Sequence, residues 1–156
     1  MLESVYIETS IISYLTARPS RNVVVAGIQE LTRDWWANKR AHYDLYISES
    51  VLREISQGDI TASQKRISAV TGISSLLIDE ESKRLAGDIL NGAKLSSKCL
   101  EDSLHIVIAA VNNIEYLLTW NCKHIANAKI IPKVELVCRE KGYQCPRICT
   151  PQELME

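Results

Sequence analysis

Short apolar runs typical of β-strands alternate along this sequence with segments of helical periodicity. The predicted strands cover residues 5–7, 44–47, 74–78 and 116–119, and a last short strand lies around Ile148. Apolar spacing predicts helices between them, among them residues 22–40, 61–70, 99–111 and 132–141. Helices between successive strands imply crossover connections, which place parallel strands in one sheet with helices on both faces. The sequence therefore predicts an α/β fold with a mostly parallel central sheet.

The length and composition fit one domain. A chain of 156 residues with 46% hydrophobic residues buries a sizeable core without disulfides or structural metals. No linker, internal repeat or low-complexity stretch interrupts it. We expect a single domain over residues 1–156.

The charge balance and the cysteines exclude some classes of protein. The 18 Lys and Arg residues nearly cancel the 19 Asp and Glu residues, so any affinity for nucleic acid must come from a local patch. The 5 cysteines are odd in number, are scattered without a CxxC pair, and accompany neither a signal peptide nor a long apolar span. This pattern disfavours a zinc site and a membrane protein, and it favours a reducing cytoplasm.

Polar residues stand where several predicted strands end. Glu8 follows the first strand, the Ser48-Glu49 turn follows the second, and Asn121 comes just after the strand at 116–119. Ser48 is also a suitable N-cap for the helix that follows it. Ligand sites of open parallel sheets form beyond the carboxyl ends of the strands, so these side chains mark the candidate site.

Two further carboxylates lie on helices at the same edge. At about 100° per residue, Glu54 lies close to the buried face that Val51 marks, whereas Glu49 points far from it. Asp102 begins the most apolar helix of the chain, where an isolated buried charge is too costly. Asp102 must therefore be paired, hydrogen-bonded, metal-bound or neutralised, although the amides of a first helical turn also satisfy an acid there.

Glu8, Glu54 and Asp102 together offer only hard oxygen ligands, which suit Mg²⁺ or Mn²⁺ better than zinc. Without a cation, clustered carboxylates repel each other and raise one another's pKa. A divalent ion neutralises them and activates water. Such a cluster is typical of enzymes that hydrolyse phosphodiesters.

Four segments together resemble the PIN-domain family, in particular its VapC-like toxin ribonucleases from toxin-antitoxin pairs. The segments are residues 5–10, residues 48–54, Glu101-Asp102-Ser103-Leu104-His105-Ile106, and Leu118-Thr119-Trp120-Asn121-Cys122-Lys123-His124-Ile125. The resemblance runs from Val5 to Pro151 and rests on the order and spacing of these motifs. It implies a three-layer α/β/α sandwich whose acids bind one or two Mg²⁺ or Mn²⁺ ions and cut RNA. It also implies an antitoxin as partner, and a homodimer.

By this resemblance Glu54 and Asp102 match acids of the family directly, whereas two positions depart from its pattern. The first-strand acid, normally aspartate, is Glu8, whose extra methylene moves the ion. The fourth acidic position, often aspartate, is Asn121, which keeps an oxygen but drops a charge and so disfavours a second ion. Three residues with small hydroxyl side chains match positions at which the family supports its carboxylates or a water molecule. These residues are Thr9, Ser10 and Thr119. Capping and turn formation explain them equally well.

Several other side chains can be interpreted as functional or as structural. His105 shares a helix face with Asp102, but a lone histidine on an apolar face is more often hydrogen-bonded core than a ligand, and we predict core. Cations that could meet RNA phosphates, or simply be solvated, are Arg18, Lys98, Lys123 and, beside them, His124. Trp35 and Trp36 end the second helix, and the one that misses the core edge would be partly exposed on a dimer or antitoxin surface.

The leading hypothesis from the sequence is metal-dependent RNA hydrolysis by Glu8, Glu54, Asp102 and Asn121. The alternative is a catalytically weakened or inactive PIN-like module that binds RNA or a protein partner, because two site positions depart from the family. A third hypothesis is a doubly wound nucleotide-binding or signalling domain. The lack of a Gly-rich phosphate loop after the first strand weighs against it.

Overall fold

The centre of the computed structural model is a five-stranded sheet in the order β3-β2-β1-β4-β5, with every neighbouring pair parallel. The structure describes residues 1–156. The strands are β1 (Glu3–Ile7), β2 (Tyr43–Ser48), β3 (Ser74–Leu76), β4 (Tyr116–Leu118) and β5 (Arg147–Cys149). The helices are α1 (Thr9–Thr16), α2 (Val23–Asn38), α3 (Glu49–Ile55), α4 (Ile60–Ala69), α5 (Glu80–Gly92), α6 (Leu100–Val111) and α7 (Ile131–Glu140). Short 3-10 turns cover Arg40–His42, Ser97–Cys99 and Pro151–Leu154.

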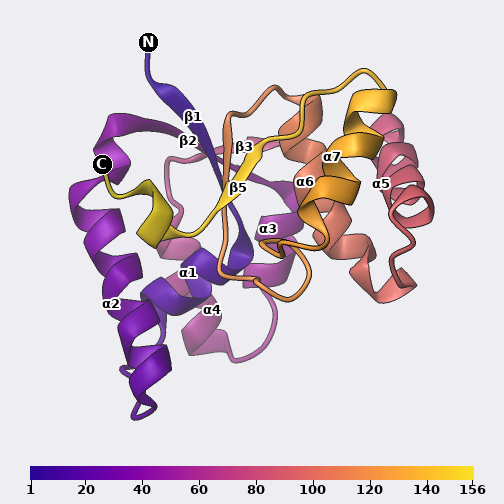
Figure 1. The fold of residues 1–156 in the computed structure, drawn as a ribbon. Helices are drawn as coiled ribbons and strands as arrows, with labels where there is room; N and C mark the ends of the chain where they lie inside the picture. Colours follow the sequence, from indigo (N-terminus) through magenta and orange to yellow (C-terminus); the bar gives the residue numbers. More distant parts are fainter.

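The strand order divides the helices between the two faces of the sheet. The chain steps from β1 to β2 and β3 in one direction and then crosses to β4 and β5 on the other side of β1. Because parallel crossovers are almost always right-handed, this reversal sends the later helices to the opposite face. Helix α1 packs on α2, α3 and α4, and α5 packs on α6 and α7 (Figure 1). The predicted three-layer α/β/α architecture is confirmed, and the sheet is entirely parallel.

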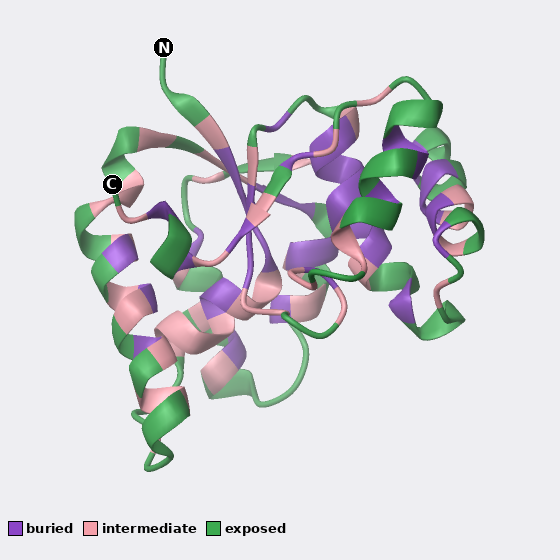
Figure 2. Cartoon of the chain, in the orientation of Figure 1, coloured by how far each residue is buried: buried purple, intermediate pink, exposed green.

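The hydrophobic core follows the strands and one helix. The middle of the sheet and α6 are the most continuously buried parts of the chain (Figure 2). In α6, every residue from Ser103 to Ala110 is buried, as expected for its apolar sequence. Leu100, an apolar residue of the same helix, is 41% exposed because it stands at the helix start beyond the sheet. A carboxylate in the first turn of α6 therefore stands at the edge of the core.

Helix α2 departs from the prediction at its start and agrees with it at its end. Val24 lies at helical spacing from the buried Trp35 but is 71% exposed, because Asn22 caps the helix by accepting from Val24 N and Val25 N and holds this first turn over solvent. Trp35 is fully buried and its Nε1 donates to Leu154 O at 2.8 Å. Trp36 is half-buried, with the Arg40 guanidinium 4.3 Å from its ring centroid. Of these two tryptophans, only Trp36 therefore offers an aromatic surface.

None of the helices combines the length and the apolar character that a membrane-spanning helix requires.

A close approach of α5 and α7 gives a test of the packing. A Cβ added to Gly92 at the end of α5 would lie 2.6 Å from Val137 Cγ2, and a β-branched side chain has little freedom to move away. We expect Gly92→Ala to lower the free energy of unfolding by roughly 1–3 kcal/mol in urea denaturation. The matched control is Gly87→Ala in the same helix, where no atom lies within 4 Å, so unfolding should cost about 0.5–1 kcal/mol more than in the wild type. Equal stability of the two variants would contradict the contact.

Candidate functional site

Glu8 lies where the two central strands of the sheet end. Its side chain is 5% exposed, and Oε1 accepts from Ser10 Oγ at 2.5 Å and from Thr119 Oγ1 at 2.6 Å. Thr119 follows β4, so this second bond joins the carboxyl ends of β1 and β4. These are the strands between which the chain reverses its direction through the sheet, the usual place for a ligand crevice in open α/β folds.

Glu54 lies on α3 and is held by two donors from other elements. Its Oε1 accepts from Thr9 Oγ1 at 2.7 Å and lies 2.6 Å from His105 Nε2. Burial raises the pKa of Glu54, but the bond and the positive charge of His105, with the Thr9 hydroxyl, more than offset it, so the pKa is lowered. Burial lowers the pKa of His105, and Glu54 with the other carboxylates overcomes this effect and raises it. Both shifts favour a carboxylate facing an imidazolium.

His105 in turn connects to the middle of the sheet. Its ring is fully buried, as predicted for a hydrogen-bonded core histidine, and Nδ1 lies 2.6 Å from the hydroxyl of Tyr6. The same hydroxyl lies 2.6 Å from Ser48 Oγ, and Ser48 also accepts from Val51 N as the predicted N-cap of α3. Tyr6 thus couples the end of β2, the buried ring of α6 and, through that ring, Glu54.

Asp102 is positioned by Asn121. Asp102 Oδ1 accepts from Asn121 Nδ2 at 3.0 Å, while Asn121 Oδ1 accepts from His124 N at 3.0 Å. A backbone N–H only donates, so this bond fixes which end of the amide is oxygen. Asn121 N also donates to Thr119 Oγ1 at 2.9 Å, and Thr119 donates to Glu8. The predicted residues Glu8, Asp102 and Asn121 therefore belong to one hydrogen-bonded chain.

The charges of the neighbouring carboxylates affect the pKa of Asp102. Burial raises the pKa of Asp102, and the charges of Glu8 and Glu54 raise it further, whereas His124 and His105 lower it. The net effect is a raised pKa. A cation placed among these groups would relieve the repulsion between them.

Each carboxylate also has one oxygen held by the protein and one left open. No hydrogen bond within the chain reaches the second oxygen of Glu8, Glu54 or Asp102. The only buried side-chain polar atom without a partner is Ser50 Oγ, so the three open oxygens reach solvent. Held carboxylates with free, solvent-facing oxygens fit Mg²⁺ or Mn²⁺.

The spacing of these groups limits how they could share an ion. The only group of three His, Cys, Asp or Glu side chains whose ligand atoms all lie within 4.8 Å of one another is Cys99, Asp102 and His124. Glu8, Glu54 and Asp102 are more widely spaced. Because Mg²⁺ usually keeps several waters and binds through one or two protein carboxylates, the spacing suits a partly hydrated ion.

The predicted supporting residues contact the carboxylates, whereas the predicted phosphate-binding residues are exposed side chains that do not. Thr9, Ser10 and Thr119 each donate to a site carboxylate. Lys98 and Lys123 are exposed and stand next to Cys99 and His124, which contact each other. Arg18 is exposed in the connection between α1 and α2, and no contact links its side chain to the carboxylates.

Sequence reasoning missed two parts of this arrangement. The first is the Tyr6 hydroxyl, although two-residue alternation along a strand places Tyr6 and Glu8 on one face. The second is Cys99, which precedes Asp102 by three residues and so shares a helix face with it. Both signals are present in the sequence, and neither identifies the partner from another segment.

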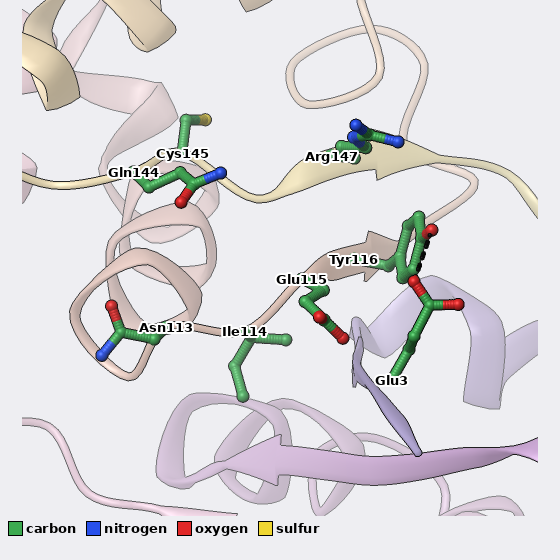
Figure 3. Close-up of a pocket in the computed structure, with 8 residues that line it drawn as sticks. All are labelled: Glu3, Asn113, Ile114, Glu115, Tyr116, Gln144, Cys145 and Arg147. Atoms are coloured by element: carbon green, nitrogen blue, oxygen red, sulfur yellow. Dashed lines mark hydrogen bonds between the residues drawn. The ribbon is translucent and has the colours of Figure 1, made fainter. Parts of the chain in front are cut away.

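A separate cavity of about 230 Å³ lies at the opposite end of the sheet. Its lining comes from the starts of β1, β4 and β5 and from nearby loops, and Tyr116 OH donates to Glu3 Oε2 across it at 3.0 Å (Figure 3). The amino ends of parallel strands are not where these folds bind substrates. The candidate site is therefore the carboxyl-end cluster.

The comparisons with known proteins bear on the fold. No family model matches the sequence, and no curated protein matches it. Among solved structures, a chain of the VapBC2 complex from Rickettsia felis, crystallised with a DNA fragment from its promoter, aligns with a TM-score of 0.53 and 15% identity. The match covers 94% of this chain and 98% of that one. The likeness is one of fold.

The Tyr6 hydroxyl gives a test of the buried network. Tyr6→Phe leaves the buried Nδ1 of His105 without a partner, so we expect the free energy of unfolding to fall by roughly 1–3 kcal/mol in urea denaturation. Tyr46→Phe is the matched control, because this half-buried tyrosine of β2 makes no hydrogen bond through its hydroxyl. Its stability should stay within about 0.5 kcal/mol of the wild type. A Tyr6 variant as stable as the control would mean that the network does not support the fold.

Proposed function

We propose that this chain is a Mg²⁺- or Mn²⁺-dependent endoribonuclease of the PIN-domain type, the toxin of a toxin-antitoxin pair. The observation that carries the proposal is the set of Glu8, Glu54 and Asp102 at the carboxyl ends of the strands, each with one fixed and one solvent-facing oxygen. The fold that it shares with a chain of a VapBC2 complex also supports this proposal. The motifs of the sequence resemble that family independently of the fold.

The residues divide into ligands and positioning groups. Glu8, Glu54 and Asp102 would hold the ion through their open oxygens, and a bound ion would supply a Lewis acid that activates water and offsets phosphate charge. Thr9, Ser10 and Thr119 fix the other carboxylate oxygens, which limits rotation of the ligands. Asn121 holds Asp102 and contributes no charge.

The substrate and the partners follow from the same proposal. The substrate is RNA, and Lys98 and Lys123 on the rim would contact its phosphates. Arg18 would do so only on a longer substrate, since it lies away from the cluster. A protein antitoxin is the proposed partner, as the VapBC2 name of the structural neighbour suggests. The half-buried Trp36 is a candidate contact for that partner or for a second copy of this chain.

The direct test combines metal binding with cleavage. We expect calorimetry to detect Mn²⁺ or Mg²⁺ binding to the wild type, and Asp102→Asn to weaken it by roughly tenfold or more, since even the loss of a supporting group costs that much. Cleavage of a mixed RNA pool should disappear in this variant and in the presence of a chelator.

The matched control is Glu49→Gln. Glu49 is an exposed acid in the first turn of α3, and its Oε2 accepts from Ile78 N at 3.0 Å, a bond that the glutamine oxygen retains. Metal affinity and cleavage should both match the wild type in this variant. A folded wild-type protein that binds neither ion and leaves RNA intact would falsify the nuclease proposal.

One observation favours a second candidate, an inactive PIN-like module that binds RNA or a protein. Both polar atoms of the Asn121 amide are used within the chain, and the three carboxylates do not converge to within 4.8 Å. This candidate predicts RNA retention in a binding assay without cleavage, unchanged by Asp102→Asn. The calorimetry and cleavage experiments decide between the two.

A further inference from the structure

Three side chains with different donor atoms meet beside the carboxylate cluster. Cys99 comes from the turn before α6, Asp102 from the first turn of that helix, and His124 from the loop after β4. Their ligand atoms all lie within 4.8 Å of one another, and Cys99 Sγ is 3.5 Å from His124 Nδ1. The proposed ribonuclease site uses only one of them, Asp102. The other two have no role in it.

We propose that Cys99, Asp102 and His124 form a second metal site, which takes a thiophilic transition-metal ion such as Zn²⁺ and inhibits the enzyme by occupying Asp102. The inhibition rests on the proposed nuclease function. The metal site itself does not, because it depends only on the three donors.

The geometry agrees with tetrahedral coordination. With Zn–S near 2.3 Å and Zn–N near 2.0 Å, sulfur and nitrogen ligands of a tetrahedral ion lie about 3.5 Å apart. The separation of 3.5 Å between Cys99 Sγ and His124 Nδ1 is what such an ion requires. The carboxylate of Asp102 needs a shift of about 1.4 Å at most, since an oxygen ligand would lie about 3.4–3.6 Å from the other two and the three ligand atoms already lie within 4.8 Å of one another.

The surroundings hold the donors in place before any ion binds. Cys99 is 4% exposed, so its sulfur has a fixed position. His124 N donates to Asn121 Oδ1 at 3.0 Å, and the same amide donates to Asp102 Oδ1 through Nδ2. Asn121 therefore positions the Asp102 carboxylate and the backbone of His124, and the His124 ring contacts Cys99. A preformed site loses little conformational entropy on binding.

The donor set selects its ion by chemistry. Thiolate and imidazole favour Zn²⁺ over Mg²⁺ and Mn²⁺, and affinities for nitrogen and sulfur sites rise from Mn²⁺ towards Cu²⁺ and Zn²⁺. Binding converts the Cys99 thiol to a thiolate and releases one proton to solvent. Three protein ligands leave a fourth position for water. Zn²⁺ bound here would occupy the Asp102 carboxylate, so that it could not share an ion with Glu8 and Glu54.

Co²⁺ provides a spectroscopic probe of the site, because a cobalt–thiolate bond gives a charge-transfer band in the near ultraviolet. We expect this band on titrating the wild type with Co²⁺, and its loss when Zn²⁺ displaces the cobalt. Cys99→Ser should remove the band, and Asp102→Asn and His124→Gln should weaken Co²⁺ binding by roughly tenfold or more. Circular dichroism establishes that each variant is folded.

Two control variants separate this site from its neighbours. Cys122→Ser alters an exposed thiol close to His124 in the same loop, and Glu8→Gln alters the oxygen cluster, so both should keep the cobalt–thiolate band. Persistence of the band in Cys99→Ser, or its absence in the wild type, overturns the proposed site.

The inhibition has a separate readout. In an RNA cleavage assay with Mn²⁺, micromolar Zn²⁺ should inhibit the wild type, and Cys99→Ser should cleave normally and resist Zn²⁺. Equal inhibition of both proteins overturns the regulatory part. If no protein cleaves RNA, the nuclease proposal fails, and the cobalt spectra still decide whether the metal site exists.

Discussion

The fully buried imidazole of His105 connects the middle of the sheet to a carboxylate of the candidate site. His105 lies between the Tyr6 hydroxyl in the middle of the sheet and the Glu54 carboxylate at its edge, with 2.6 Å on each side. Removing either neighbour would leave a polar nitrogen in the core without a partner, which is among the costlier defects a fold can have. The ring thus fixes the rotation of α6 against β1 and α3. Asp102, three residues earlier on α6, takes its position from the same constraint.

The amide of Asn121 limits the negative charge next to the Asp102 carboxylate. An aspartate there would place a fourth negative charge against Asp102, which already has a raised pKa. Asn121 instead donates to Asp102 and accepts from the backbone of His124. This departure from the pattern of the PIN-domain proteins that the sequence resembles therefore removes repulsion and supplies a hydrogen bond at the same point. In the proposed metal site, the missing charge favours one oxygen-bound ion over two.

Sequence reasoning reached the fold class because strands and helices are encoded locally. Boundaries were less secure: the strand expected at residues 74–78 stops at Leu76, because the chain then turns towards Asp79, which caps α5. The positions of Glu8, Glu54 and Asp102 at one edge followed from strand ends and helix periodicity. The buried network of Tyr6, His105 and Glu54 did not, because Tyr6 and His105 are 99 residues apart and meet only through the sheet order. Val24 shows the same limit, since helical spacing does not reveal where a helix extends past the core.

The placement of β1 in the middle of the sheet determines when the carboxylate cluster can form during translation. This strand is synthesised before the other four, yet it acquires its β4 neighbour only after residues 116–118 have emerged, and Thr119 reaches Glu8 across 111 positions. Contacts of such long range slow folding, and they deny a partly synthesised chain its central pairing. A nascent chain on the ribosome, surrounded by RNA, therefore carries Glu8 and Glu54 but no assembled cluster. The acidic site is assembled only after the chain has been translated as far as Thr119 and Asn121.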